Sequence, residues 1–433
     1  MNGEIIDDLL KMTVLLVRQS YDKTKAIDFR YECKIIVINE KQIMKIVNIF
    51  VALFCLTACS LSNDLKDRLI LKPQSILIDP DKVKDFIDLT PLLRDSVEII
   101  PLETKDECLL SEIERIEFYK DRIFVLDRTR KGVYMFDQSG RFIGKIGCQG
   151  SGPGEFTSVG FFCVTGDSVL ISDQHQSKWV VYNLQDKRTT EFSCGEFTYL
   201  NGFLMGRNLY LVSNYNKSQS DRFNLYKFDL STRKIEEALI PFEEKMDKYS
   251  TTAFTIYASQ YQDTAFLIYP FNDTIYEVSS KGAQPFYTID FTQRNLPDDI
   301  EPINNSFRLA VAKGNFVKGL SYMQMSGNYI LGRYADKGYF RYLSVDRSTL
   351  KSTVGNSFVV RDLGYLPVTS FYTIGDALVS VYSASALMQM LDVILSPDSP
   401  IKEKYRTKFE SLKQITNCEG NPVLLKFQFE SAE

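Results

Sequence analysis

The sequence predicts an all-β protein, a six-bladed β-propeller with four-stranded blades. Three observations support this fold class. Six short runs of β-branched and aromatic residues resemble one another, most are followed by a hairpin pattern, and the units recur roughly every 40 to 65 residues. Aromatic residues make up 13% of the chain, with 30 Phe and 24 Tyr but one Trp, which favours pleated, half-buried sheets over helix bundles.

Each of the six runs is roughly alternating and ends in a turn former or a polar residue, which is typical of a strand. The runs are RIFVLD (122–127), SVLISD (168–173), NLYLVSN (208–214), TAFLIYP (264–270), NYILGRY (328–334) and ALVSVYS (377–383).

After each of the first five runs comes a segment in which a polar or Gly-bearing turn separates two strand-like halves, as in GVYMFDQSGRFIGKIG. An apolar run precedes the strand, such as VGFFCV before SVLISD, so one unit has four strands. A β-sandwich is also rich in short strands, but similar units at this period favour a propeller, in which blades cover one another's apolar faces. The loop assignments below depend on a count of six.

Two strand-like segments lie outside the regular units, DSVEIIPLE (95–103) and NPVLLKFQFE (421–430). Because a propeller commonly closes its ring by completing one blade with strands from both ends of the chain, we expect these two segments to form the clasp. Between the sixth run and the last strand, residues from about 384 to 415 have helical spacing interrupted by Pro397 and Pro400. They predict a short helical insertion on the rim of the propeller domain, 95–433.

The N-terminal part contains a predicted lipoprotein signal peptide, residues 44–58. A Lys is followed by an apolar run from Ile46 to Leu56, and small residues then precede Cys59. The arrangement resembles the lipobox of bacterial lipoproteins, which implies that Cys59 is diacylated; an ordinary signal peptide or a buried strand is the alternative. Residues 1–43 are then an upstream extension or a short helical arm, and 59–94 form a tether and lead-in. The expected location is the cell envelope, lipid-anchored, on the outer membrane.

Several stretches resemble a known family, namely EIIPLE, the first blade with its exit loop from Arg122 to Phe156, PFNDTIYEV and NPVLLKF. They are similar to the six-bladed β-propeller lipoproteins of Bacteroidetes, and the first blade also resembles an NHL repeat. The resemblance covers residues 95–430. It implies the fold and the cell envelope but little chemistry, because propellers include enzymes, binders and scaffolds.

The glycine-rich stretch GCQGSGPGEF (147–156) is not typical of a phosphate-binding loop. It lacks the Lys and the following helix of a Walker motif, and strands flank it on both sides. We expect it to carry the chain from one blade to the next, with glycines at positive φ and Glu155 bonded to nearby backbone N–H groups. The residues assigned to this structural loop are Gly150, Gly152, Pro153, Gly154 and Glu155.

Composition excludes several classes of function. A net charge of -4 does not favour nucleic-acid binding, the single His cannot build a multi-His metal site, and no Cys-x-x-Cys spacing suggests zinc. No cofactor, metal or catalytic residue is therefore expected. A Ser/His/Asp relay is not supported, because no Gly-x-Ser-x-Gly motif precedes the single His. Carboxylates are plentiful, but no two of them stand out as the catalytic pair of a glycosidase.

The candidate binding residues lie in the loops that follow the six runs, which a propeller brings to one face. They are Arg128, Arg130, Lys131, His175, Lys178, Lys217, Arg222, Asp336 and Lys337. Cations gathered on one face of an acidic protein could bind a glycan, a peptide carboxylate or an envelope protein partner through charge-assisted hydrogen bonds. The alternative is that these loops are only solvated and bind no ligand. Trp179, Tyr215 and Tyr339 could stack on sugar rings, with core packing favoured for Trp179.

The sequence therefore predicts a non-catalytic, lipid-anchored envelope protein that binds a ligand or partner through one face. The alternative is a carbohydrate-active hydrolase or lyase that uses carboxylates at the central channel. Two facing carboxylates at the channel would favour hydrolysis, and a cationic or aromatic floor would favour binding. A pure scaffold would have neither a pocket nor clustered charge on this face.

Overall fold

The computed structural model describes residues 72–430, apart from 194–198, 217–220, 250–257 and 298–304. The predicted extension 1–43, the predicted signal peptide 44–58 and Cys59 lie outside the described residues. Lys72 to the C-terminus forms one compact unit.

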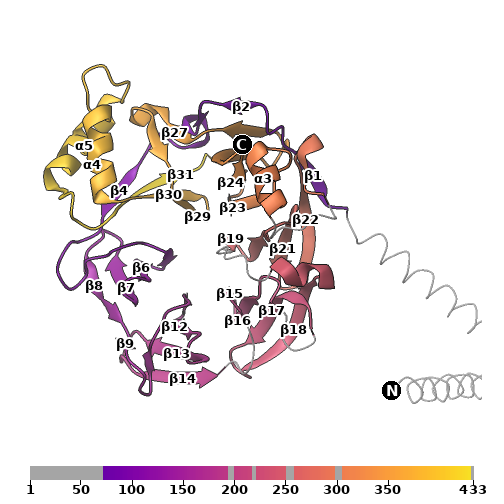
Figure 1. Cartoon of the computed structure of the whole chain (residues 1–433). Coiled ribbons are helices and arrows are strands. Elements are labelled where there is room, and N and C mark those ends of the chain that lie inside the picture. The colour runs from indigo at the N-terminus through magenta and orange to yellow at the C-terminus, as the bar shows by residue number, and fades with distance from the viewer. Residues whose placement is uncertain (1–71, 194–198, 217–220, 250–257, 298–304, 431–433) are drawn as a thin grey trace, which may run out of the picture. The chain divides into compact units, whose positions relative to one another are not determined.

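Within the described residues, seven sheets of three or more strands are arranged around a central axis, which confirms the β-propeller (Figure 1). Five sheets follow the chain in order, with the first strand innermost. Their strands are β5 (Arg115–Tyr119), β6 (Arg122–Asp127), β7 (Gly132–Asp137) and β8 (Phe142–Ile146); β11 (Phe161–Thr165), β12 (Ser168–Asp173), β13 (Lys178–Asn183) and β14 (Thr189–Ser193); β15 (Asn201–Met205), β16 (Asn208–Val212), β17 (Phe223–Asp229) and β18 (Lys234–Pro241); β19 (Ser259–Tyr261), β20 (Thr264–Leu267), β21 (Thr274–Ser279) and β22 (Gly282–Asp290); and β23 (Leu320–Met325), β24 (Tyr329–Asp336), β25 (Tyr339–Asp346) and β26 (Ser352–Gly355).

The remaining two sheets combine strands from both ends of the described chain. The sixth contains β28 (Leu366–Val368), β27 (Phe358–Val360) and β3 (Ile87–Asp88), and the seventh contains β29 (Phe371–Ile374), β30 (Ala377–Tyr382), β31 (Val423–Gln428) and β4 (Glu98–Pro101).

All six predicted runs are strands, and each is the second strand of its sheet: β6, β12, β16, β20, β24 and β30. These strands are the most apolar because they are covered on both faces by neighbouring sheets. In β6, for example, Ile123, Phe124 and Val125 have no solvent exposure. Burial on both faces produces a nearly continuous apolar run, which is why the second strands were the easiest to recognise.

The predicted count of six blades is wrong, because the sheet β28–β27–β3 makes a seventh. Its strands have only two or three residues each, and β3 comes from the N-terminal segment. It pairs in parallel with β27, through Phe358 opposite Ile87. A blade this short, assembled from distant segments, has no strand-loop-hairpin pattern in the sequence.

The segment before the first regular blade adds one strand to each of four sheets along the rim. β1 (Gln74–Leu77) pairs in parallel with β22, β2 (Val83–Lys84) pairs in parallel with β26, and β3 and β4 complete the last two sheets. Residues 59–94 were expected to be a tether and lead-in, but within the described residues strands begin at Gln74. These strands are too short for the alternation of a strand to show in the sequence.

The ring is closed by the two predicted clasp segments, which pair with each other. β31 lies between β30 and β4, and Leu424 is opposite Ile100 in the antiparallel register. Figure 1 shows the yellow C-terminal strand beside the indigo N-terminal one. Because closure places the last sheet beside the first, it covers the two apolar faces that an open array of sheets would expose.

The predicted helical insertion contains two helices, α4 (Ala384–Ile394) and α5 (Glu403–Ile415). Ser383 caps α4 by accepting a hydrogen bond from the Ala386 N–H, and the helices bury Leu387, Leu391 and Phe409 against the last two sheets. A further helix, α3 (Asn305–Lys313), lies between β22 and β23 and was not predicted.

The hydrophobic core lies between the sheets rather than at the axis. One cluster joins β6 and β7 to β12 through residues such as Phe124 and Ile171, and another joins β16 to β20 through Val212 and Leu267. Trp179 is fully buried between the second and third sheets, as expected, with its ring centroid 5.1 Å from that of Phe161. Each sheet therefore covers the apolar face of the next.

Truncation of Leu424 tests the closure. Leu424 has no solvent exposure and lies in the cluster that joins the closing sheet to the first sheet. We expect Leu424→Ala to lower the free energy of unfolding by about 2–5 kcal/mol, because a buried cavity replaces the side chain. Leu77→Ala, at a Leu that is 59% exposed, should change it by less than about 0.5 kcal/mol. Urea denaturation measures both, and equal effects would contradict the assignment of the clasp.

Candidate functional site

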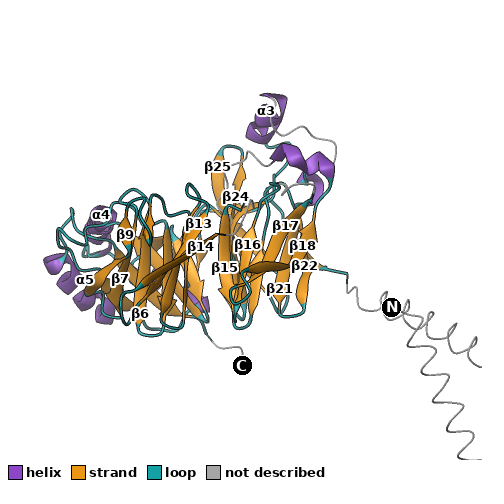
Figure 2. Ribbon diagram, turned by 90° about the horizontal axis from the view of Figure 1, so that it is seen from below, coloured by secondary structure: helices purple, strands orange, loops and turns teal. Residues whose placement is uncertain are grey.

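One face of the propeller carries most of the polar loops. It is formed by the loops between the second and third strands of each sheet and by the connections from each fourth strand to the next sheet, and we call it the top face. Figure 2 shows α3 and the β24–β25 hairpin projecting from it. Although the ring has seven sheets rather than six, the predicted binding residues that the structure describes belong to this face, because the order of strands within each sheet, and not the number of sheets, fixes where a loop emerges.

In the first blade, the predicted cations are held by local contacts. Arg128 forms an ion pair with Glu114 and donates a hydrogen bond to the Gly160 carbonyl at 3.1 Å. Arg130 donates to the Ser111 hydroxyl at 3.2 Å, and Lys131 is exposed. Two of the three cations thus link the β6–β7 loop to neighbouring connections.

The second blade follows the same pattern. His175 is exposed, and its backbone N–H donates to the Asp173 carboxylate at 3.1 Å. Lys178 pairs with Glu191 at 2.8 Å. Burial alone would raise the pKa of Asp173, but hydrogen bonds from Thr157, Gln176 and Ser158 outweigh it and lower the pKa to about 2. Asp173 therefore stays charged and organises this corner of the top face. Lys217 lies outside the described residues.

The glycine-rich loop connects the first two blades, as expected. Its ends pair as β9 (Cys148–Gln149) and β10 (Glu155–Phe156), and the Glu155 carboxylate accepts a hydrogen bond from the Gly152 N–H at 2.8 Å. A Cβ on Gly150 would lie 2.0 Å from Glu155 Oε2. The glycine thus makes room for a carboxylate that belongs to the protein rather than to a ligand.

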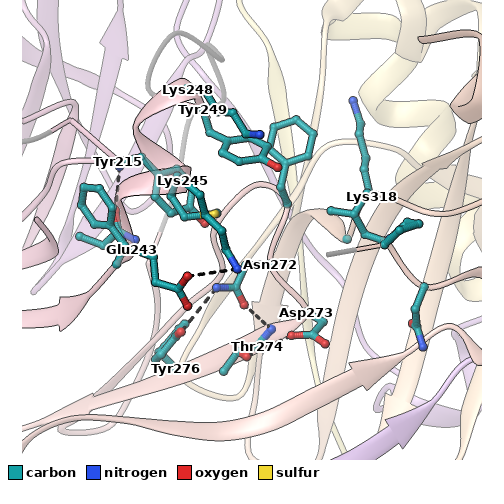
Figure 3. A pocket seen from close by; sticks show the side chains of 18 of the residues that line it. Tyr215, Glu243, Lys245, Lys248, Tyr249, Asn272, Asp273, Thr274, Tyr276 and Lys318 are labelled. Carbon is teal, nitrogen blue, oxygen red and sulfur yellow. Dashed lines mark hydrogen bonds and ion pairs between the residues drawn. The ribbon is translucent and has the colours of Figure 1, made fainter. Parts of the chain in front are cut away.

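The structure describes a pocket of about 350 Å3 on the top face, around the fourth sheet (Figure 3). Three connections form its walls: the one that leaves β18, the β20–β21 loop, and the one between β22 and β23. Its lining residues include Tyr215, Phe242, Glu243, Lys245, Lys248, Tyr249, Phe271, Asn272, Asp273, Tyr276, Phe291, Asn295 and Lys318.

Aromatic rings form one side of this pocket. The ring centroids of Tyr249 and Phe271 lie 4.5 Å apart, and Tyr215 lies 5.9 Å from Tyr249. Tyr215 is 1% exposed and donates a hydrogen bond to the Pro270 carbonyl at 2.9 Å, so it supports the wall from behind. Phe271 and Tyr276 are only half-buried, and they present ring surface to the pocket.

Polar groups occupy the rest of the lining. Lys245 pairs with Glu243 at 3.1 Å, whereas Lys248 lies with its amine 5.8 Å from the Tyr249 ring centroid. Figure 3 shows Lys318 on the side of the pocket opposite Tyr215 and Glu243. Burial lowers the pKa of the Lys318 ammonium, because the surrounding protein replaces part of its hydration. The pocket thus combines ring surfaces with amines.

Three of the predicted residues support the walls of the pocket without lining it. Arg222 binds Asp247 of the η3 turn (Glu244–Tyr249) through two bonds of 3.0 and 3.1 Å. On the other side, Arg294 of the η4 turn (Thr292–Arg294) bonds to buried Asp336 and, at 3.0 Å, to Asp81. Asp81 also accepts a bond from Lys337, at 3.1 Å.

Gly319 sets the width of the pocket. Its φ of +90° is in the left-handed region, and a Cβ on it would lie 2.8 Å from the Asn272 carbonyl oxygen. The connection before β23 can therefore approach the β20–β21 loop only without a side chain at this position. Asn272 is in turn fixed by accepting the Thr274 N–H at 2.7 Å.

A second cavity, of about 490 Å3, lies at the central channel, among the first strands. Glu117 is the only carboxylate among its described lining residues, and it pairs with Arg115 at 2.8 Å. Although 22% of the Glu117 side chain opens into the cavity, burial raises its pKa, and Arg115 partly offsets this effect. The described lining therefore does not contain the pair of carboxylates that a glycosidase requires.

The lysines and most of the aromatic residues of the top-face pocket were not predicted. The motif PFNDTIYEV, noted for its family resemblance, supplies five lining residues: Phe271, Asn272, Asp273, Thr274 and Tyr276. The lysines come from long connections, which the strand pattern did not cover. Length was the available signal, since long connections on a rigid scaffold often carry binding residues.

The family model described as "Domain of unknown function (DUF4934)" matches residues 85–428. The chain belongs to the DUF4934 family. A search of curated proteins found no match. Across the described residues, no helix has both the length and the apolar character needed to cross a bilayer.

Two solved structures are similar to this chain. A "Putative exported protein" from Bacteroides fragilis NCTC 9343 is 20% identical with a TM-score of 0.65, over 83% of this chain and 100% of that one. A member of the duf4221 family from Bacteroides vulgatus is 10% identical with a TM-score of 0.43, over 78% of this chain and 97% of that one. The first of these similarities supports the propeller fold.

Substitution of Gly319 tests how the pocket is built. We expect Gly319→Ala to lower the free energy of unfolding by about 1–3 kcal/mol, because it adds a clash to a strained φ. Gly206→Ala is the matched control, since Gly206 has a φ of +59° and open space around its Cβ position. It should show only the smaller cost of the left-handed conformation, about 1 kcal/mol. Thermal and urea denaturation compare the two, and an equal loss would contradict the close approach.

Proposed function

We propose that this family member is a lipid-anchored cell-envelope protein that binds a ligand through its top face and is not an enzyme. The observation that carries the proposal is the pocket, which half-buried rings, amide groups and lysines line together. Rings together with placed polar groups can hold and orient a small molecule. A scaffold alone would not need such a hollow.

The arrangement of the pocket supports specific binding. Its walls are held by ion pairs and a glycine contact, so little conformational entropy is lost when a ligand enters. Phe271 and Tyr276 offer ring faces, and Asn272 and Asn295 belong to the polar part of the lining. At about 350 Å3, the pocket suits a small ligand or the end of a larger one.

The alternative, a hydrolase or lyase at the central channel, is not favoured. Hydrolysis of a glycosidic bond typically needs two carboxylates that flank it. Both oxygens of Glu117 are already engaged: Oε1 with Arg115 at 2.8 Å and Oε2 with the Val164 N–H at 3.2 Å. The channel therefore offers an internally paired carboxylate rather than an acid and a base.

The cations elsewhere on the top face would assist binding from the rim. Arg128, Lys131, Lys178 and Lys337 share this face with the pocket, and together they favour the approach of an anionic ligand. Because several of them form local ion pairs, we assign them attraction at a distance rather than direct contact. A partner protein that presents such a ligand is included in the proposal.

The proposed location is supported by residues 44–58 of the sequence and by one solved structure that is similar to this chain. The Bacteroides fragilis protein with a similar structure carries the description of an exported protein. Here, residues 44–58 have the layout of a lipoprotein signal peptide, and Cys59 would carry the lipid. We propose attachment to the outer membrane.

Truncation of Phe271 tests the binding function. Phe271→Ala removes a ring surface from the pocket, so capture of a ligand identified on a glycan and peptide array should weaken by about tenfold or more. Phe86→Ala is the control, because Phe86 is 40% exposed and lies outside the pocket. The array and a thermal shift measure capture and folding for both variants. Unchanged capture by a folded Phe271→Ala protein would contradict the pocket as the binding site.

The lipid anchor is tested at Cys59. We expect Cys59→Ala to abolish labelling by a clickable fatty acid, because the sulfur that carries the lipid is removed, and to release the protein from the membrane fraction. Cys148→Ala, at an exposed cysteine of the propeller, should leave both unchanged. Persistent labelling of the Cys59→Ala protein would end the proposal of an anchor at this residue.

A further inference from the structure

We infer that the central channel is a second binding site, which takes an uncharged sugar from the end of the ring opposite the top face. The site is the cavity of about 490 Å3 among the first strands. It shares no described lining residue with the top-face pocket, so the inference does not depend on the proposed function. Three features of the lining carry it: the position of the mouth, the paired charges, and two oriented amides.

The lining places the mouth of the cavity at the face opposite the top face. At that face lie the turns between the first and second strands, and three of them supply lining residues: Gly206, Gln262 and Gly375. At the other end of β5, Arg115 links the first and third sheets, because its Nη1 donates to the Asn201 side chain at 2.8 Å and to the Gly202 carbonyl at 3.1 Å. A ligand would therefore enter between the turns, along the axis of the ring.

The charges in the lining are paired with each other. Arg115 and Glu117 are the only charged side chains among the described lining residues, and Glu117 Oε1 lies 2.8 Å from Arg115 Nη2 and 3.0 Å from Nε. Glu117 Oε2 accepts the Val164 N–H at 3.2 Å. A charged ligand would lose hydration without gaining a counter-charge from this lining, which is costly. The cavity therefore favours a neutral ligand.

Gln324 directs a hydrogen-bond donor into the cavity. Its side chain lines the cavity, the residue is 4% exposed, and its Oε1 accepts the Thr373 N–H at 2.9 Å. Because a backbone N–H can only donate, this bond fixes the orientation of the amide and leaves Nε2 at the end away from Thr373. Nε2 has no acceptor among the described residues. Since buried donors need acceptors, an oxygen atom of a ligand would be its partner.

Gln260 presents the complementary group. Its Nε2 donates to the Leu204 carbonyl at 2.6 Å, so Oε1 is the atom of this amide that remains for a ligand. The lining thus offers a donor from the fifth sheet and an acceptor from the fourth. A hydroxyl group can donate and accept, whereas a carboxylate only accepts and an ammonium group only donates. A ligand with several hydroxyl groups can therefore satisfy both amides.

Apolar surface lies between the polar groups. Leu204, Ile374 and Tyr119 line the cavity and are half-buried. The Tyr119 hydroxyl accepts the Gly166 N–H at 2.9 Å, which fixes its ring. A sugar matches this mixture, because the C–H faces of its ring are apolar and its edge carries hydroxyl groups. The volume lies within the range of about 300–1,000 Å3 that is typical of small-molecule sites.

The first test measures the preference for a neutral sugar. Glucose, galactose and mannose are each compared by titration calorimetry with the amino sugar and the uronic acid of the same ring. At least one neutral sugar should bind, about tenfold or more tightly than both of its charged relatives, because the channel supplies no counter-charge for them. The same titration in Phe271→Ala should be unchanged, since Phe271 lines only the top-face pocket.

The second test changes one amide. Gln324→Glu keeps an oxygen for the Thr373 N–H and replaces Nε2 by a second oxygen. The neutral sugar should bind about tenfold or more weakly, and the preference should shift toward the amino sugar, whose ammonium group supplies a positive charge. A merely structural role of Gln324 would weaken all three relatives alike. Gln414→Glu makes the same change of charge at an exposed position on α5, outside the cavity, and should leave binding unchanged.

A further variant guards against misfolding. Gln260 is exposed, so Gln260→Ala should fold like the unaltered protein, and it should weaken binding of the neutral sugar by about threefold or more because the acceptor is lost. Thermal shifts of all variants confirm that they are folded.

Three outcomes would overturn the inference. If none of the three neutral sugars binds, the channel holds only solvent. If N-acetylglycinamide, a neutral amide that is not a sugar, binds as tightly as the best sugar, the site recognises a peptide instead. If binding is lost in Phe271→Ala but kept in Gln324→Glu, the sugar occupies the top-face pocket, which would support the proposed function and reject the channel site.

Discussion

The whole structure depends on the burial of apolar side chains between neighbouring sheets in a closed ring. An isolated four-stranded sheet would expose one or both faces to water, and the clusters around Phe124, Val212 and Leu424 show how each face is covered by the next sheet. Closure by β4 and β31 is the condition for this coverage, because without it two sheets would lose a neighbour. The N-terminal strands β1 to β3 extend the same ring along its rim.

This packing also fixes the top face. The second strands end in polar residues at the point where they leave the core, and three of these residues are buried carboxylates: Asp127, Asp173 and Asp336. Asp127 and Asp173 bind backbone N–H groups of the preceding connection, whereas Asp336 binds Arg294. Buried carboxylates require such partners, so the connections are drawn to defined positions over the ring. The polar loops are therefore ordered by the core beneath them.

The pocket lies on the top face, between two long connections. The described parts of the connections between β18 and β19 and between β22 and β23 form walls of the pocket, and Arg222 and Arg294 hold these walls. Several cations of the top face, among them the predicted Arg222, are thus part of the architecture and do not line the pocket. A binding site made from connections can change its chemistry while the ring beneath it stays the same.

The sequence by itself determined the kind of fold, because a strand buried on both faces must be continuously apolar, and β6, β12 and β30 carry that pattern. It also determined the clasp and the helical segment, whose patterns are local. The tertiary structure alone decided the count of sheets and the place of the pocket. The sheet β28–β27–β3 is too short to show alternation and joins residues that are more than two hundred and seventy positions apart. Likewise, Lys248 and Lys318 face one space only because the ring brings their connections together, and no local pattern encodes that proximity.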